Sequence, residues 1–231
     1  MITTHDKIHF TEWHDVDNYI NCGKLKFSAG YVERVKYGNY PELAFSKGQM
    51  ASKNWLIEQL FLLNQTQSLI NNNDIIAILG CWIGSLVEPL IDTFSPYRIY
   101  GIDIDPEAIA LAEKFNQHYV GNGWKFKGFV DDINELPSNN MQIQSEGELI
   151  EVKPNVIINT SCEHVSNHWF DTAETDQLII MQTNNYTEWH DHINNCYSID
   201  EMQQKYPLTR TLYAGELLMP VYTRYMQIGF K

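Results

Sequence analysis

A glycine turn between a short apolar run and a helical pattern constrains the fold of this 231-residue chain most strongly. Residues 75–79 are apolar, and residues 80–84 read Gly-Cys-Trp-Ile-Gly. A second apolar run, 98–103, ends in an acidic residue about 20 positions beyond the turn, the distance typical of nucleotide-binding βαβ units. Glycine lets the backbone approach a ligand closely, and a strand-end carboxylate can accept both ribose hydroxyl hydrogens. This order predicts a nucleoside site across the ends of two parallel strands.

The turn alone also fits any tight strand-to-helix connection, because it lacks the full G-x-G-x-x-G fingerprint. The later elements narrow the interpretation. Asp105 can cap a helix whose first position is Pro106, and residues 85–93 and 41–63 have helical periods. Further strands are expected at 124–130, 156–159 and 177–182, with a small hairpin at 141–152 and an antiparallel pair within 211–230. Alternating strands and helices predict an α/β fold with a doubly wound, mostly parallel sheet.

Four segments, taken in order, resemble the class I S-adenosylmethionine (SAM)-dependent methyltransferase family. They are residues 78–84, 101–109, 130–136 and 155–165. The resemblance covers roughly residues 55–231 and implies a Rossmann-like doubly wound sheet of seven strands, with a C-terminal antiparallel pair and an N-terminal helical extension. It implies that residues 1–73 are an extension or lid of the same domain, and that residues 74–231 form the SAM-binding, methyltransferase-like part.

The resemblance also assigns roles to residues. The glycine turn would pass beneath the methionine part of SAM, Asp103 would hold the ribose, and Ile104 would line the adenine pocket. Asp132 would accept from the adenine amino group, and Ile133 would pack on the ring. Residues 159–164 would line the side where the methyl group is exposed. The implied cofactor-binding residues are Gly80, Cys81, Trp82, Gly84, Asp103, Ile104, Asp132, Ile133 and Asn159.

Two positions depart from the family pattern. Leu79 stands where the family usually has an acidic residue, so the cofactor amino group loses a customary partner. Trp82 is large for the middle of the turn and reshapes the methionine pocket. Its indole either stacks near the sulfonium, which would gain roughly 0.5–2 kcal/mol, or packs in the core against the first helix. Asp103 has a local alternative as well, as a helix cap.

The segment after the fourth expected strand carries the candidate chemistry. His164 could take a proton from an acceptor, with Glu163 beside it. The alternative for this pair is helix capping and structural hydrogen bonding. His190, after the fifth strand, is a second candidate base. His190, Asp191 and His192 could bind a divalent metal in principle, but without a fixed third or fourth ligand we expect no metal site.

Composition limits partners and location. The net charge is −13, from 16 basic and 29 acidic residues, so we expect no duplex nucleic-acid partner. No run approaches the roughly 18–20 apolar residues that cross a membrane, and the N-terminus does not read as a secretory signal. Four scattered cysteines without a C-x-x-C pair predict a reduced, cytoplasmic protein, and Cys162 is expected to be a buried thiol.

The function expected from the resemblance is a SAM-dependent methyltransferase whose acceptor is a small molecule or a protein side chain. Two alternatives stay open. One is a SAM-using enzyme of another reaction type, aminocarboxypropyl transfer or sulfonium cleavage. The other is a non-catalytic binding module that keeps the fold.

Overall fold

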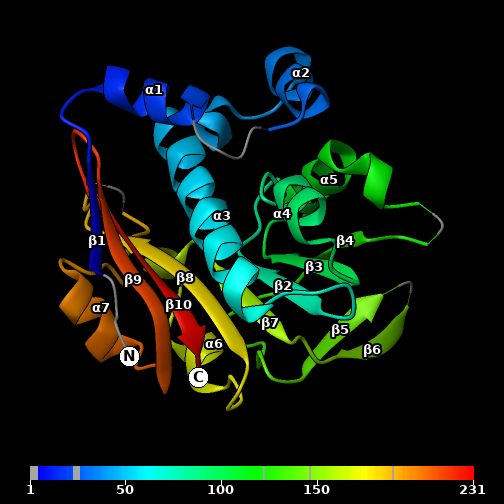
Figure 1. The fold of residues 1–231 in the computed structure, drawn as a ribbon. Coiled ribbons are helices and arrows are strands. Elements are labelled where there is room, and N and C mark those ends of the chain that lie inside the picture. The colour runs from blue at the N-terminus through cyan, green and yellow to red at the C-terminus, as the bar shows by residue number, and fades with distance from the viewer. Residues whose placement is uncertain (1–4, 23–26, 122, 146, 189) are drawn as a thin grey trace.

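An eight-stranded mixed sheet forms the centre of the protein in the computed structural model, which describes residues 5–22, 27–121, 123–145, 147–188 and 190–231 (Figure 1). Its strands, in spatial order, are β1 (His5–His9), β9 (Arg210–Leu218), β10 (Thr223–Phe230), β8 (Leu178–Asn184), β7 (Val156–Asn159), β2 (Ile75–Leu79), β3 (Arg98–Asp103) and β4 (Phe126–Val130). Strand β10 is antiparallel to both of its neighbours, and the other pairs are parallel. The predicted α/β fold with a C-terminal antiparallel pair is confirmed.

The sheet has one strand more than the seven implied by the resemblance. The additional strand, β1, pairs in parallel with β9, with His9 opposite Leu218. Its five residues, HDKIH, include one apolar side chain, so no alternating pattern marked them as a strand. Residues from the N-terminal extension therefore belong to the main sheet.

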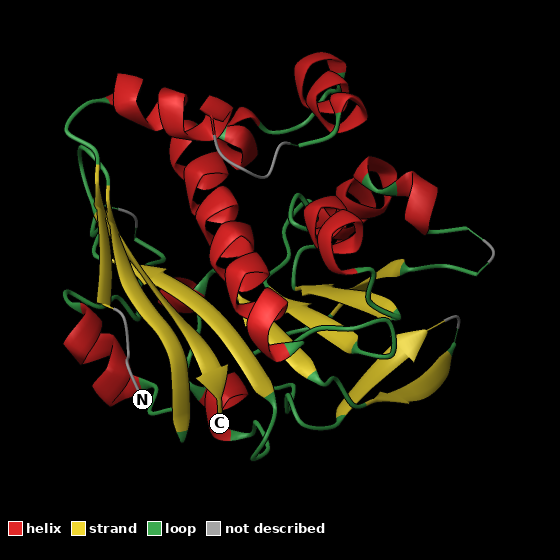
Figure 2. Ribbon diagram, viewed as in Figure 1, coloured by secondary structure: helices red, strands yellow, loops and turns green. Residues whose placement is uncertain are grey.

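Helices cover both faces of the sheet, as Figure 2 shows. The helices α3 (Lys47–Gln67), α4 (Val87–Phe94) and α5 (Pro106–Phe115) lie on one face, and α6 (His168–Asp171) and α7 (Ile199–Lys205) lie on the other. Strand β2 shows why, because Ile76 and Ile78 enter one core while Ala77 and Leu79 enter the other. A strand buried on both sides needs a continuous apolar run, and this explains the pattern of residues 75–79.

The N-terminal extension forms α1 (Trp13–Cys22), α2 (Ala29–Tyr37) and the 3-10 helix η1 (Glu42–Phe45) before α3 begins. Helix α2 is anchored to the start of α4. The Tyr31 hydroxyl donates to the Ser85 carbonyl at 2.9 Å, and the buried Glu88 carboxylate accepts from Ser28 and Arg34. The extension thus contacts the segment that directly follows the glycine turn.

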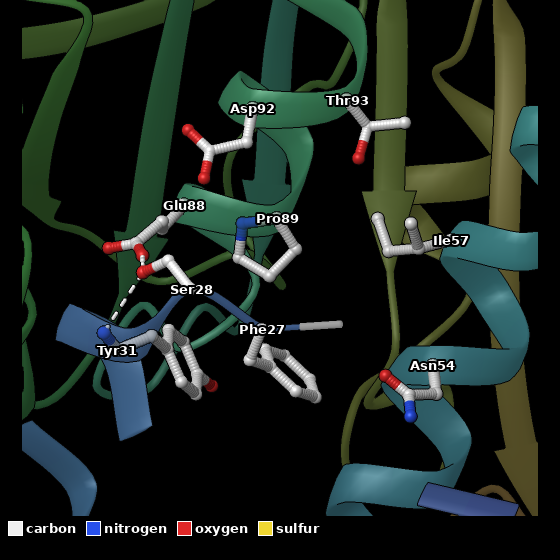
Figure 3. A pocket seen from close by; sticks show the side chains of 9 residues that line it. All are labelled: Phe27, Ser28, Tyr31, Asn54, Ile57, Glu88, Pro89, Asp92 and Thr93. Atoms are coloured by element: carbon white, nitrogen blue, oxygen red, sulfur yellow. Dashed lines mark hydrogen bonds between the residues drawn. The ribbon is translucent and has the colours of Figure 1, made fainter. Parts of the chain in front are cut away.

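A small cavity of about 40 Å³ lies between α2, α3 and α4. In Figure 3 its lining includes Phe27 and Ser28, which precede α2, together with Asn54 of α3 and Thr93 of α4. Its size corresponds to little more than a water molecule. This cavity therefore belongs to the packing of the extension and is too small for a nucleoside.

The connection between β4 and β7 is irregular for a doubly wound fold. In place of a crossover helix it forms the hairpin of β5 (Met141–Ser145) and β6 (Glu148–Val152), as predicted. The predicted turn lies at Glu146-Gly147; position 146 is outside the described residues, and Gly147 has a φ of +87°.

Among the described residues, no helix combines the length and the apolar character that crossing a bilayer requires.

Candidate functional site

The turn after β2 has three residues in the left-handed region. Gly80, Trp82 and Gly84 have φ angles of +64°, +48° and +65°. A Cβ on Gly84 would lie 2.7 Å from Nδ2 of Asn116, the side-chain amide that donates to the Gly84 carbonyl at 3.0 Å. A Cβ on Gly80 would lie 3.3 Å from Cβ of Ser161. A side chain at Gly84 would therefore force Asn116 to shift, and one at Gly80 would press on Ser161, while both positions also have a positive φ.

The carboxylate of Asp103 lies directly against this turn. Its Oδ2 accepts from the backbone N–H of Trp82 at 2.8 Å, and its Oδ1 accepts from that of Asp105 at 3.1 Å. An ionised carboxylate has roughly four lone-pair positions, so two acceptor positions are left for a ligand. The helix cap of α5 is Asp105 and not Asp103, so the local role of Asp103 is to hold the turn, and the predicted ribose-binding role stays a prediction.

Two exposed apolar side chains flank Asp103. Ile104 follows β3 and is 64% exposed, while Val130 ends β4 opposite Asp103 and is 53% exposed. Ile133 is buried in the core, 6% exposed. Oδ1 of Asp132 accepts from the backbone and the side-chain amide of Asn134, each at 2.9 Å. The exposed apolar residues next to Asp103 are therefore Ile104, which was predicted, and Val130, which the sequence analysis did not name. Asp132 stabilises its own turn.

The middle of the turn differs from a plain glycine loop. Trp82 is half-buried and holds a positive φ, a conformation that costs a bulky residue about 1–2 kcal/mol. The neighbouring Cys81 is buried, and this burial, with the nearby charge of Asp103, raises the pKa of its thiol. Nδ2 of Asn159, at the end of β7, is buried and has no hydrogen-bond partner among the described residues. The edge of the sheet therefore offers hydrogen-bond acceptor positions on Asp103, exposed apolar side chains beside it, and an unpaired donor on Asn159. These three features suit a nucleoside that carries a polar chain.

Glu163 occupies a buried, paired position in the 3-10 helix η3 (Cys162–His164), and is 2% exposed. Its Oε1 accepts from the amide of Asn184 and lies 3.7 Å from Nη2 of Arg224. Arg224 also donates to the carbonyl of Thr160 at 3.2 Å. Oε2 of Glu163 is buried and has no partner in the described part of the chain. The structure therefore gives Glu163 a structural ion pair and leaves one oxygen available.

His164 lies beside the loop that follows β8. Its Nδ1 is 3.0 Å from Oδ2 of Asp191, and its ring centroid is 4.5 Å from that of His192. Nδ1 of His192 lies 2.5 Å from the carbonyl oxygen of Tyr186. His190, the other predicted base, has an exposed side chain. The structure thus brings His192, two residues further on, against His164.

Two buried cations next to this site were missed by the sequence analysis. Arg224 is the second residue of the alternating strand β10, and Lys53 lies within a helix, so neither has a local signal of function. Lys53 is 6% exposed and donates to Gln49 at 2.8 Å. Burial, with the charge of Arg224, lowers the pKa of Lys53 to about 7. The two side chains share one buried polar region between α3 and the sheet.

The prediction that Cys162 is a buried thiol is confirmed. Cys162 is fully buried, and burial together with the charge of Glu163 raises the pKa of its thiol well above the usual value. A raised pKa suppresses the thiolate that a nucleophile needs. Cys162 therefore acts as a packing residue of η3.

Comparison with known proteins identifies the fold. No protein-family model and no curated protein sequence matches the chain. Magnesium protoporphyrin IX methyltransferase (ChlM) from Synechocystis PCC 6803, with S-adenosylhomocysteine (SAH) bound, superimposes with a TM-score of 0.57 at 14% identity, over 94% of this chain and 98% of that chain. A putative RNA methyltransferase, PH1948 from Pyrococcus horikoshii, gives 0.52 at 13% identity, over 96% and 97%. The fold is that of class I SAM-dependent methyltransferases.

Proposed function

We propose that this chain is a SAM-dependent methyltransferase. The donor would lie on the loops after β2, β3 and β4, and the acceptor would approach from η3 and the loop after β8. Two structures of the same fold carry bound SAM or SAH, which supports SAM as the donor. In α/β sheets generally, ligands bind at the carboxyl ends of the strands.

One observation carries the proposal. The Asp103 carboxylate is fixed by two backbone N–H groups and keeps open acceptor positions beside the exposed Ile104 and Val130. The adenine of a bound donor would cover these exposed apolar side chains, as apolar groups line most small-molecule sites. A ribose on the carboxylate and an adenine on the apolar pair would use both features together.

The chain's own residues would mainly orient the two reactants. When bound, SAM supplies a methyl group that the sulfonium already activates. Holding donor and acceptor in line can contribute roughly 7–11 kcal/mol of barrier reduction. Because Asp191 contacts Nδ1 of His164, Nε2 is the ring nitrogen that would take a proton from the acceptor. Asp191 would also stabilise the resulting imidazolium.

The acceptor class follows from charge and from the residues near the site. We propose a small molecule or a protein side chain, because the chain carries a net charge of −13 and the cations beside the site, Lys53 and Arg224, are buried. A duplex would need an exposed basic surface.

Calorimetric titration of the full chain with SAM tests the proposal. We expect one binding site and a raised melting temperature, since a ligand that binds only the folded state stabilises it. Incubation with SAM and candidate acceptors should then release SAH. No binding at millimolar SAM with an unchanged melting temperature would leave only a binding module of the same fold.

A second reaction type has one observation in its favour. The strained Trp82 and the apolar Leu79 reshape the place where the methionine part would lie. Such a pocket could expose the aminocarboxypropyl group in place of the methyl group. Product analysis separates the two reactions, because methyl transfer yields SAH while transfer or cleavage at the other sulfonium bond yields methylthioadenosine.

A further inference from the structure

Three potential metal ligands meet beside the proposed acceptor position. Glu163, His164 and His192 each offer one ligand atom, and these atoms lie within 4.8 Å of one another. Ligands bound 2.0–2.2 Å from a zinc ion in tetrahedral geometry are roughly 3.5 Å apart. A shift of about an ångström in the half-buried histidines would therefore close the set around an ion.

Both imidazoles are already oriented through Nδ1. Nδ1 of His164 lies 3.0 Å from a carboxylate oxygen of Asp191, and Nδ1 of His192 lies 2.5 Å from the carbonyl oxygen of Tyr186. With Nδ1–H donating to an oxygen, the lone pair is on Nε2. Histidines that ligate metals almost always donate their second N–H to a carboxylate or carbonyl in this way.

Glu163 gives an independent observation. Its side chain is 2% exposed, and its Oε1 faces both Asn184 and Arg224. Its Oε2 is buried without a partner among the residues that the structure describes. Leaving a buried carboxylate oxygen unpaired is costly, so native structures usually supply a partner. A cation between Oε2 and the two imidazoles would supply one.

We propose that Glu163, His164 and His192 bind a divalent transition-metal ion. Two imidazoles and one carboxylate are a ligand set of catalytic zinc and of other first-row metals, and they leave at least one coordination position open. The sequence analysis expected no metal, because the spacing within 190–192 offers no complete ligand set. The ligands come from segments about 28 residues apart, which meet because β7 and β8 are neighbours.

The open position would receive the acceptor, and this part of the inference rests on the proposed methyltransferase function. An ion at this point would bind an oxygen of the acceptor and lower the pKa of a hydroxyl, so that its proton leaves to solvent. His164 would then act as a ligand in place of a base. The acceptor class becomes a small molecule or side chain with a hydroxyl oxygen that can coordinate a metal.

Titration of the metal-free full chain with Zn²⁺, and separately with Co²⁺, tests the site. We expect one ion per chain, and at least a 100-fold loss of affinity in His164→Ala and in His192→Ala. Asp191→Asn should lose 10–100-fold, because it orients a ligand without being one. His118→Ala, an exposed histidine of η2 (Gln117–Tyr119), and Cys22→Ser, at an exposed thiol, should bind as the unchanged chain does.

Equal affinity in the unchanged chain and in both histidine variants would overturn the site, as would binding that disappears in Cys22→Ser. Thermal unfolding without metal shows whether each variant is folded. We expect His192→Ala to be folded, because His192 is a half-buried loop residue. SAH affinity measured on the same samples separates the two proposals. Metal binding without SAH binding would contradict the methyltransferase, and SAH binding without metal binding would contradict the metal site.

Discussion

The two halves of the sheet's carboxyl edge are held together differently. In the donor half, the loops after β2, β3 and β4, backbone N–H groups fix the carboxylates, as Trp82 and Asp105 fix Asp103. In the acceptor half, η3, the loop after β8 and the start of β10, buried side chains hold one another, as Asn184 and Arg224 hold Glu163. Buried atoms without partners among the described residues include Oε2 of Glu163 and Nε of Arg224 in this half.

The difference teaches which half is vulnerable. Substituting one neighbouring side chain leaves the hydrogen bonds of a carboxylate held by backbone N–H groups intact, so stability changes little. Substituting one partner of a buried ion pair lowers stability strongly, because the other partner stays charged and desolvated. The buried polar groups of the acceptor half therefore lower the stability of the fold, whereas apolar side chains could fill the same space. Such a cost is typical of sites that bind a ligand.

The largest expected effect is at Arg224. Arg224→Met should lower the free energy of unfolding by about 3–5 kcal/mol, because Glu163 then remains buried without its cation. Urea unfolding measures it. Arg210→Met, at an exposed arginine of β9, is the matched control and should change stability by under about 1 kcal/mol. Equal losses in the two variants would show that the buried pair contributes nothing particular to stability.

The next effect concerns pH. The pKa of Lys53 is about 7 when folded and ordinary when unfolded, so the unfolded chain binds more protons between pH 7 and about 10. Stability should rise with pH across that window, by up to about 1.4 kcal/mol per unit from this group. Lys53→Met should flatten the rise and stabilise the protein at pH 7.

Lys47→Met is the control for this pH effect, since Lys47 is an exposed residue of the same helix that pairs with Asp17. Its unfolding free energy should keep the slope of the unchanged chain between pH 7 and 9. If Lys53→Met keeps that slope too, Lys53 is charged in the folded protein.

In the donor half, Gly84 should be the most sensitive backbone position. Gly84→Ala should cost about 1–3 kcal/mol, because a side chain at φ +65° is strained and its Cβ would contact Asn116 at 2.7 Å. Gly121→Ala, where no atom lies within 4 Å and φ is not positive, should be neutral. Chemical unfolding of both variants, side by side, would reject the tight turn if their losses were the same.

The smallest effect compares two substitutions of Trp82. Both Trp82→Gly and Trp82→Ala remove the indole, but only glycine adopts φ +48° without strain. Glycine also loses more conformational entropy on folding than alanine, which offsets part of this gain. The net free energy of unfolding of Trp82→Gly should exceed that of Trp82→Ala by about 0.5–1 kcal/mol. An alanine variant of equal or greater stability would mean that the backbone at position 82 is unstrained.

The same contrast explains how much could be predicted from sequence. The donor half is made of residues close together in the chain, so glycines, strand ends and the cap at Asp105 marked it. The fold class and the placement of Gly80, Gly84 and Asp103 on one edge followed from these local signals.

The acceptor half could not be predicted in this way. Lys53, Glu163 and Arg224 lie far apart in the sequence and meet only after the sheet has formed. His192 was seen only as a neighbour of His190, because nothing in the spacing indicated that β7 and β8 would bring it to His164. Strand β1 was missed because its pairing with β9 stabilises five residues that have little preference of their own.

The central claim is that the Asp103 carboxylate binds the ribose of an adenosyl ligand, and competition calorimetry against SAH tests it most directly. In the unchanged chain, adenosine should compete at least roughly 100-fold better than 2′,3′-dideoxyadenosine, since two hydrogen bonds to a charged group contribute about 1.5–3 kcal/mol each. In Asp103→Ala the two competitors should be equal, while Asp200→Ala, at an exposed carboxylate of α7, should discriminate as before. Unchanged discrimination in Asp103→Ala would contradict the account.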